Sequence, residues 1–343
     1  MKTTKQVAAQ PDAAQSLDSR AKKYLLQGED DQAERCLKQA LAIQEQTLGA
    51  DHPETARTLN DLANLYADAC RNDQAGRFFK RALAIREMVL GPDHVDTGAS
   101  LNGLATVYLA KDKYDQAEPL LKRALAIREK ALGEEDLDTA STLHNLARVC
   151  SRQGKNDQAE PLYERALAIR EKALGEEHFD TATSLHDLAG LYRSQHKYDQ
   201  AEPLYMRACA IYDKVMGADF PETIECLYQF AGMYYSQGKC DQAAELCKRV
   251  LKIRDRSPRA SYSDKARSRC LLATVYSAQG KHDQAELLVK QALAISEKFF
   301  KLDDLEVAMV LENYAAMLKA AKRDADAEPL RRRAAQIRAK HKF

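Results

Sequence analysis

The feature that most constrains the fold of this chain is a sequence repeat of fixed length. The tripeptide Asp-Gln-Ala recurs every 42 residues, beginning at Asp31, Asp73, Asp115, Asp157, Asp199, Asp241 and Asp283. An eighth, degraded copy keeps Ala327 and Glu328 in register, and no insertion or deletion interrupts the spacing from Ala33 to Ala327. Self-similarity at one period indicates that a single supersecondary unit is copied and stacked along the chain.

Each copy predicts two helices, as the unit over residues 139–175 shows most clearly. Apolar side chains within residues 143–150 are spaced at i, i+3, i+4 and i+7, which is typical of one buried helix face. Gly154 ends this first helix, and Asp157, three residues before Glu160, is expected to cap a second one. Gly175 then supplies the left-handed residue that commonly follows a helix C-terminus.

A long coiled coil is the alternative, because a period of 42 residues equals six heptads. The glycine break, the aspartate cap and the Leu-Gly stop would interrupt a continuous helix twice in every period. Short antiparallel helix pairs therefore fit the punctuation better. The sequence predicts an all-α protein of about eight helix pairs, in which neighbouring pairs complete each other's core.

The composition limits both the compartment and the chemistry. Lys and Arg number 52 against 51 Asp and Glu, so the chain lacks the basic excess expected of a nucleic-acid-binding protein. No run of 18 apolar residues could form a membrane span, and residues 1–15 lack the apolar core of a secretory signal, which indicates a cytoplasmic protein. The eight cysteines include no CxxC pair, so we expect free thiols rather than disulfides or zinc ligands.

No catalytic motif is present, neither a phosphate-binding loop, nor a nucleophile elbow, nor a paired-histidine metal site. The sequence therefore predicts a protein that is not an enzyme, with no cofactor and no metal ion.

Two further patterns carry a family resemblance. Residues 59–66 read Leu-x-x-Leu-Ala-x-x-Tyr, and Ala75 and Ala82 follow on the second helix, which resembles the tetratricopeptide (TPR) signature. The longer period, with LNGLATVY at 101–108 and YDQAEPLLKRALAIREKALG at 114–133, resembles the kinesin light chain repeats. The resemblance implies a right-handed α-α superhelix, a TPR solenoid of about eight helix pairs.

The repeats divide the chain into expected segments. Residues 1–12 are predicted to be disordered, and residues 13–256 to form a regular TPR array of about six repeats. Residues 257–264, which contain Pro258 and several serines, predict an irregular junction. Residues 265–343 are expected to form a divergent C-terminal TPR pair with a basic capping helix.

The resemblance also implies where a partner binds, because first helices line the concave face in this family and peptides lie along it. The expected groove positions are Arg57, Asn60, Asn64, Asn102, Thr106, His144, Arg148, Arg152, His186, Arg193, Tyr228 and Tyr235. Asparagine offers a donor and an acceptor to a peptide backbone, and arginine offers a forked donor to carboxylates. One interpretation of Arg148, Arg152 and Arg193 is thus an acidic peptide ligand; the other is a solvated helix face with paired charges.

Two functions follow from these patterns. The first is a non-catalytic scaffold that binds peptide segments of partner proteins in the concave groove, as kinesin light chain-like cargo or adaptor recognition would require. The alternative is a structural scaffold that self-assembles into oligomers through its solenoid ends or convex face.

Overall fold

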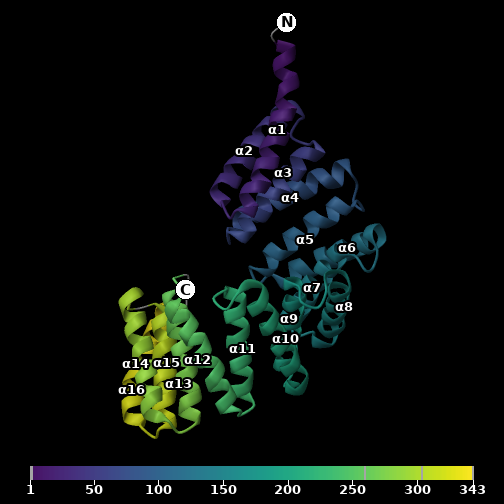
Figure 1. The fold of residues 1–343 in the computed structure, drawn as a ribbon. Coiled ribbons are helices and arrows are strands. Elements are labelled where there is room, and N and C mark those ends of the chain that lie inside the picture. The colour runs from purple at the N-terminus through teal and green to yellow at the C-terminus, as the bar shows by residue number, and fades with distance from the viewer. Residues whose placement is uncertain (1–2, 259, 303, 342–343) are drawn as a thin grey trace. The chain divides into compact units, whose positions relative to one another are not determined.

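The computed structural model describes residues 3–258, 260–302 and 304–341, and these ranges contain sixteen α-helices and no strand. They fall into two compact units, Met1–Ala173 and Leu174–Phe343, which are described separately below (Figure 1). The helices of unit 1 are α1 (Thr3–Leu26), α2 (Asp30–Thr47), α3 (Pro53–Asp68), α4 (Asn72–Val89), α5 (Val95–Leu109), α6 (Tyr114–Leu132), α7 (Leu137–Arg152) and α8 (Asn156–Leu174, whose last residue begins unit 2). Those of unit 2 are α9 (Phe179–Ser194), α10 (Tyr198–Met216), α11 (Pro221–Ser236), α12 (Cys240–Arg256), α13 (Tyr262–Ala278), α14 (His282–Phe299), α15 (Leu305–Ala320) and α16 (Asp324–Lys340).

Consecutive helices pack as pairs, which confirms the predicted eight helix pairs. An odd-numbered first helix contacts the following second helix, for example α3 with α4 and α9 with α10. In α7 and α8 the same pairing buries Ala140 and Leu143 against Ala166 and Ile169. The recurring alanines are fully buried, as Ala105 and Ala124 illustrate. Such small side chains let neighbouring helix backbones approach closely, and the larger side chains beside them fill the remaining space.

A buried arginine near the end of the second helix joins one pair to the next. Arg128 of α6 donates to the Asp138 carbonyl at 2.8 Å and to Thr142 Oγ1 at 2.7 Å, both on α7. Arg86 and Arg254 contact their own following helices at the same sequence offsets. Because burial removes water from the three guanidinium groups, it lowers their pKa values. Carbonyl and hydroxyl oxygens accept the hydrogen bonds that water would otherwise accept. We call these contacts the arginine junctions.

A glutamate near the start of the second helix forms a second recurring contact. Glu34 accepts hydrogen bonds from Lys38 at 2.6 Å, from the Tyr66 hydroxyl at 2.8 Å and from Arg71 at 3.0 Å. Glu286 accepts from a set of the same three kinds, and Glu118 and Glu202 each accept from two of the three. We call these sets the glutamate networks.

The glutamate networks predict how stability depends on pH. Hydrogen bonds, first from Lys122 and then from Lys155, lower the pKa of Glu118 from 4.5 to about 2. A depressed carboxyl pKa stabilises the fold above the unfolded value, and that stabilisation is lost as pH falls from 4.5 towards 2. Melting temperatures across this interval should therefore fall less steeply in Glu118→Gln than in the wild type. Glu135→Gln, at an exposed connector residue, is the control; equal slopes in all three proteins would contradict the prediction.

The predicted irregular junction over residues 257–264 includes the connector between α12 and α13. Helix α12 ends at Arg256 and α13 begins at Tyr262, while residue 259 lies outside the described residues. The connector contains an arginine junction like the others, because Arg254 donates to the Asp264 carbonyl at 3.2 Å and to Ser268 Oγ at 2.7 Å. The two compact units divide elsewhere, between residues 173 and 174.

Of the segment over residues 1–12, for which disorder was predicted, residues 1 and 2 lie outside the described residues, and α1 begins at Thr3. The segment contains Lys, Gln and Ala, which favour helix and allow α1 to extend towards the N-terminus.

The prediction that the repeated aspartates cap the second helices is wrong. Lys113, Lys197 and Lys239 are the N-cap residues of α6, α10 and α12, and none makes a side-chain capping bond. The aspartate lies inside the first turn, where its charge is favourable near the positive end of the helix dipole. Side-chain caps occur on first helices instead, for example where His94 Nδ1 accepts from the Asp96 amide at 3.1 Å.

The cysteine prediction also needs correction, because Cys209 of α10 and Cys226 of α11 form a disulfide. The other six cysteines are free thiols, as expected. Packing of a second helix on the next first helix places the two Cα atoms 5.7 Å apart, a proximity that no spacing rule reveals.

Candidate functional site

The first helices of successive pairs are direct neighbours within each unit. In unit 1, α3 contacts α5 and α5 contacts α7; in unit 2, α9 contacts α11, α11 contacts α13 and α13 contacts α15. The second helices α2, α4, α6, α10, α12 and α14 pack instead on their own first helix and on the first helix that follows. In each unit these touching first helices, α3, α5 and α7 in unit 1 and α9, α11, α13 and α15 in unit 2, therefore form a continuous surface, which we call the first-helix face. All twelve predicted groove residues belong to these helices.

At the N-terminal end of unit 1, two of the predicted residues make internal contacts. Arg57 forms ion pairs with Asp18 at 3.1 Å and with Glu54 at 2.6 Å. Asn60 Oδ1 accepts hydrogen bonds from Arg86 and Ser100, each at 3.2 Å. These two side chains thus help to hold unit 1 together, whereas Asn64, one turn beyond Asn60, is exposed.

The next pairs bring together an asparagine pair that the sequence did not suggest. Asn102 of α5 accepts a hydrogen bond from Asn145 of α7, with 3.2 Å between amide nitrogen and oxygen, and both side chains are half-buried. This contact fixes how the two amides are oriented relative to each other. Thr106 donates to the Gly103 carbonyl at 2.7 Å.

Helix α7 carries the remaining predicted residues of unit 1. His144 is buried, with its ring edge-on to Tyr163 at a centroid distance of 5.4 Å, so it lies beneath the surface. Arg148 is half-buried and Arg152 is exposed, one turn further along the helix. Both lower the pKa of Tyr114 electrostatically, against the larger effect of its hydrogen bond to Asp112, which raises it. The two positive charges therefore lie together near the start of α6.

In unit 2, the predicted residues lie among aromatic rings. His186 has ring centroids 5.8 Å from Tyr205 and 6.2 Å from Tyr212. Burial raises the pKa of Tyr205 to about 12, and the charge and hydrogen bond of Arg193 oppose that rise. His186 and Arg193 are both half-buried, so part of each side chain is accessible on the first-helix face.

Tyr228 is placed between two cations. The guanidinium carbons of Arg254 and Arg267 lie 5.3 and 5.6 Å from its ring centroid. Burial raises the pKa of Tyr228 and both arginines lower it. Tyr235, two turns further along α11, is half-buried. The sequence analysis named the tyrosine but missed Arg254, although the recurrence of Ile-Arg near the end of the second helices was a signal for it.

The described residues offer neither a metal site nor a membrane-spanning helix. Among them, no group of three or more His, Cys, Asp or Glu side chains is placed to hold a metal ion. Within the same ranges, no helix is both long and apolar enough to cross a membrane.

Comparisons with known proteins agree with the repeat geometry. The profile of the tetratricopeptide repeat family matches residues 12–87, 60–130, 99–172, 138–214 and 223–298. No curated protein matches the chain significantly.

Several solved structures are similar. Putative kinesin light chain TPR-like repeats from Podosopora anserina are 28% identical, covering 61% of this chain and 99% of that chain with a TM-score of 0.51. BtubC (BKLC) from P. vanneervenii is 25% identical over 68% of this chain and 89% of that chain, with a TM-score of 0.56. The apo form of the quorum sensor NprR from B. thuringiensis, 12% identical over 94% and 87%, shares the fold with a TM-score of 0.70.

Proposed function

The chain belongs to the tetratricopeptide repeat family, and we propose that it is a non-catalytic scaffold that binds peptide segments of partner proteins along the first-helix face. The observation that supports this most directly is that successive first helices touch and present polar side chains at the same turn. A peptide main chain needs donors and acceptors at regular intervals, and Asn102 with Asn145 supplies both. The similarity to putative kinesin light chain repeats supports an adaptor role of the same general kind.

The proposed ligands include acidic segments. Arg148 and Arg152 place two cations on one helix of unit 1, and Arg193 places another on α9 of unit 2. Forked guanidinium donors recognise carboxylates with two parallel hydrogen bonds. The cytoplasm is the proposed location, and neither cofactor nor nucleic acid is needed for this role.

Fluorescence anisotropy with labelled acidic, neutral and basic peptides of equal aromatic content tests the proposal. The double variant Arg148→Glu/Arg152→Glu and the single variant Arg193→Glu should each lower the affinity for acidic peptides by about tenfold or more. This is the effect expected from the loss of one charge-assisted hydrogen bond. Asn102→Ala should weaken acidic and neutral peptides alike, because it removes a contact to the main chain. Lys130→Glu and Lys252→Glu, at exposed second-helix positions, are the matched charge controls.

Two outcomes would count against this function. If charge reversal on the first helices leaves affinity unchanged, the acidic preference is wrong. If no peptide binds and the mass from light scattering rises with protein concentration, self-assembly is the better account.

A further inference from the structure

The glutamate networks follow a rule that one repeat of unit 2 breaks. In a complete network the acceptor lies at the same repeat position, occupied by Glu34, Glu118, Glu202 and Glu286. Ala244 occupies this position on α12 and cannot accept a hydrogen bond from its side chain. The three donors that would converge on a glutamate there are nevertheless all present as Lys248, Tyr276 and Lys281.

These donors keep the arrangement seen in the complete networks. The Lys281 ammonium lies 5.5 Å from the centroid of the Tyr276 ring. One repeat earlier, Lys239 lies at the same 5.5 Å from Tyr234, and both donate to Glu202, at 2.8 and 2.9 Å. The donor geometry is thus present at Ala244 without the carboxylate that the donors hold elsewhere.

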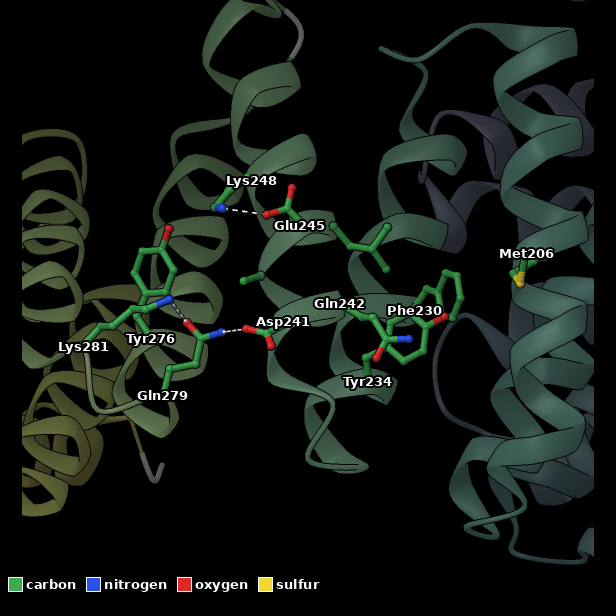
Figure 2. A pocket seen from close by; sticks show the side chains of 12 residues that line it. Met206, Phe230, Tyr234, Asp241, Gln242, Glu245, Lys248, Tyr276, Gln279 and Lys281 are labelled. Atoms are coloured by element: carbon green, nitrogen blue, oxygen red, sulfur yellow. Dashed lines mark hydrogen bonds and ion pairs between the residues drawn. The ribbon is translucent and has the colours of Figure 1, made fainter.

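A pocket of about 630 Å³ lies at this place in unit 2. Figure 2 shows Lys248, Tyr276 and Lys281 at one end of it, with Phe230 and Met206 at the other. The pocket therefore has a hydrogen-bonding end, where two ammonium groups lie beside the carboxylates of Asp241 and Glu245, and an apolar end. Its size falls within the range of natural ligand sites, about 300–1,000 Å³.

The groups now in the pocket engage its cations only weakly. Lys248 pairs with Glu245 at 2.7 Å, but their side chains are 49% and 74% exposed, and such surface pairs are weak because water screens them. Lys281 donates to Gln279 at 2.9 Å, and Gln279 donates to Asp241 at 2.8 Å. Lys281 has a neutral amide as its partner where Lys239 has a carboxylate.

We infer that this pocket binds an acidic side chain from a peptide segment of a partner protein, whose carboxylate takes the place of the glutamate missing at position 244. An apolar neighbour in the same peptide lies against Phe230 and Met206. A peptide fits better than a small free acid because α12 leaves the pocket open along exposed residues such as Gln242 and Glu245. Where the donor set is complete it stabilises the ionised acceptor: Lys290 and its partners lower the pKa of Glu286 to about 2.

None of the residues that line this pocket is among the twelve predicted groove residues, although Phe230, Tyr234 and Tyr276 belong to first helices. The inference therefore does not rest on the proposed function. A variant at Ala244 does not change Arg148, Asn102 or Arg193, and variants of those three residues do not change the pocket. Experiments can therefore contradict the pocket proposal without contradicting the proposed function, and the reverse.

Supplying the missing acceptor within the chain is the first test. Ala244→Glu should raise the melting temperature, because three donors gain an ion partner, while Ala244→Gln should raise it less. Ala210→Glu, on an exposed second-helix position, is the control for added charge. If Ala244→Glu is no more stable than Ala244→Gln, the donors do not converge on this position and the inference is overturned.

Binding is the second test, with a phage-displayed random peptide library as the probe. We expect clones selected on the wild type to share an Asp or Glu beside an apolar residue. Their synthetic peptides should bind Ala244→Glu and Lys281→Met at least about tenfold more weakly, and so should peptides with that acid changed to its amide. Glu245→Gln should bind them more tightly, because it removes the competing carboxylate.

Three results would contradict the inference. The first is selected peptides without a shared acid, or peptides that bind Ala244→Glu as well as the wild type. The second is N-acetylglutamate binding as tightly as the selected peptides, which would assign the pocket to a small acid. The third is a loss of self-association in Ala244→Glu by light scattering, which would assign it to a second copy of the chain.

The sequence contains the same gap once more, at Gly76 in unit 1. Its corresponding donors are Lys80, Tyr108 and Lys113, and the Lys80 ammonium lies 5.8 Å from the Tyr108 ring centroid. Gly76→Glu should therefore also raise the melting temperature relative to Gly76→Gln. A rise at neither position would overturn the donor rule itself.

Discussion

Replacing Gly103 with alanine is expected to destabilise unit 1 by about 1–3 kcal/mol, the usual cost of overpacking a core. The direction is informative because glycine to alanine inside a helix normally stabilises by about 0.5–1 kcal/mol. A Cβ at position 103 of α5 would lie 2.3 Å from Cε1 of Phe79, whose ring is 1% exposed. The flat ring is enclosed on all sides and cannot move away cheaply.

The neighbouring repeat shows how this clash can be relieved. In that repeat Leu121 is equivalent to Phe79, and Asn145 is equivalent to Gly103. A second-helix side chain smaller than phenylalanine therefore occurs with a first-helix residue larger than glycine. Phe79→Leu/Gly103→Ala should therefore recover much of the stability that Gly103→Ala loses, as measured by urea denaturation. Gly232→Ala is the matched control, because a Cβ at Gly232 meets nothing within 4 Å and should stabilise. Destabilisation by Gly232→Ala as well would show that steric contact is not the cause.

The second large effect is expected for Arg128→Met. Methionine keeps much of the apolar stem but leaves the Asp138 carbonyl and the Thr142 hydroxyl without the guanidinium that donates to them. Leaving polar groups of this kind without their charged donor costs about 1–3 kcal/mol. Arg128→Lys should recover only part of this, because an ammonium lacks the fork that reaches two acceptors.

A control for the charge lies on the same helix. Arg123 pairs with Glu87 at 2.5 Å on the surface, with side chains 40% and 36% exposed, so Arg123→Met should cost less than about 1 kcal/mol. Chemical denaturation of both variants measures the difference. Equal losses in the two variants would mean that burial of Arg128 adds nothing to its effect.

The helix pairs could be predicted because the relevant information is periodic. The 42-residue spacing and the apolar stripe over residues 143–150 determine helix number, approximate bounds and which faces are buried. The capping prediction failed at Asp157 because a sequence pattern locates the start of a helix only to within about two residues. An aspartate just before the helix and one in its first turn therefore give the same pattern. The break between units also escaped prediction, because it depends on packing between residues far apart in the sequence.

The candidate site was predicted less completely. Placement of Asn102 and Arg148 on first helices followed from the repeat position alone. The burial of His144 and the hydrogen bonds of Asn60 did not, because both depend on which second-helix side chain reaches that point. Arg86 contacts Asn60, and Tyr163 covers His144. To distinguish accessible first-helix side chains from those already in contact within the fold, one must know which second-helix side chain reaches each position in each repeat.

The arginine junctions have a consequence for how such a chain can change length. Each buried arginine must reach a carbonyl ten residues onward and a hydroxyl fourteen residues onward. Adding one residue to the intervening connector would move both acceptors out of reach and strand the charge. Gaining or losing a whole 42-residue unit keeps every such distance, so growth by duplication of complete repeats is tolerated where growth by single residues is not.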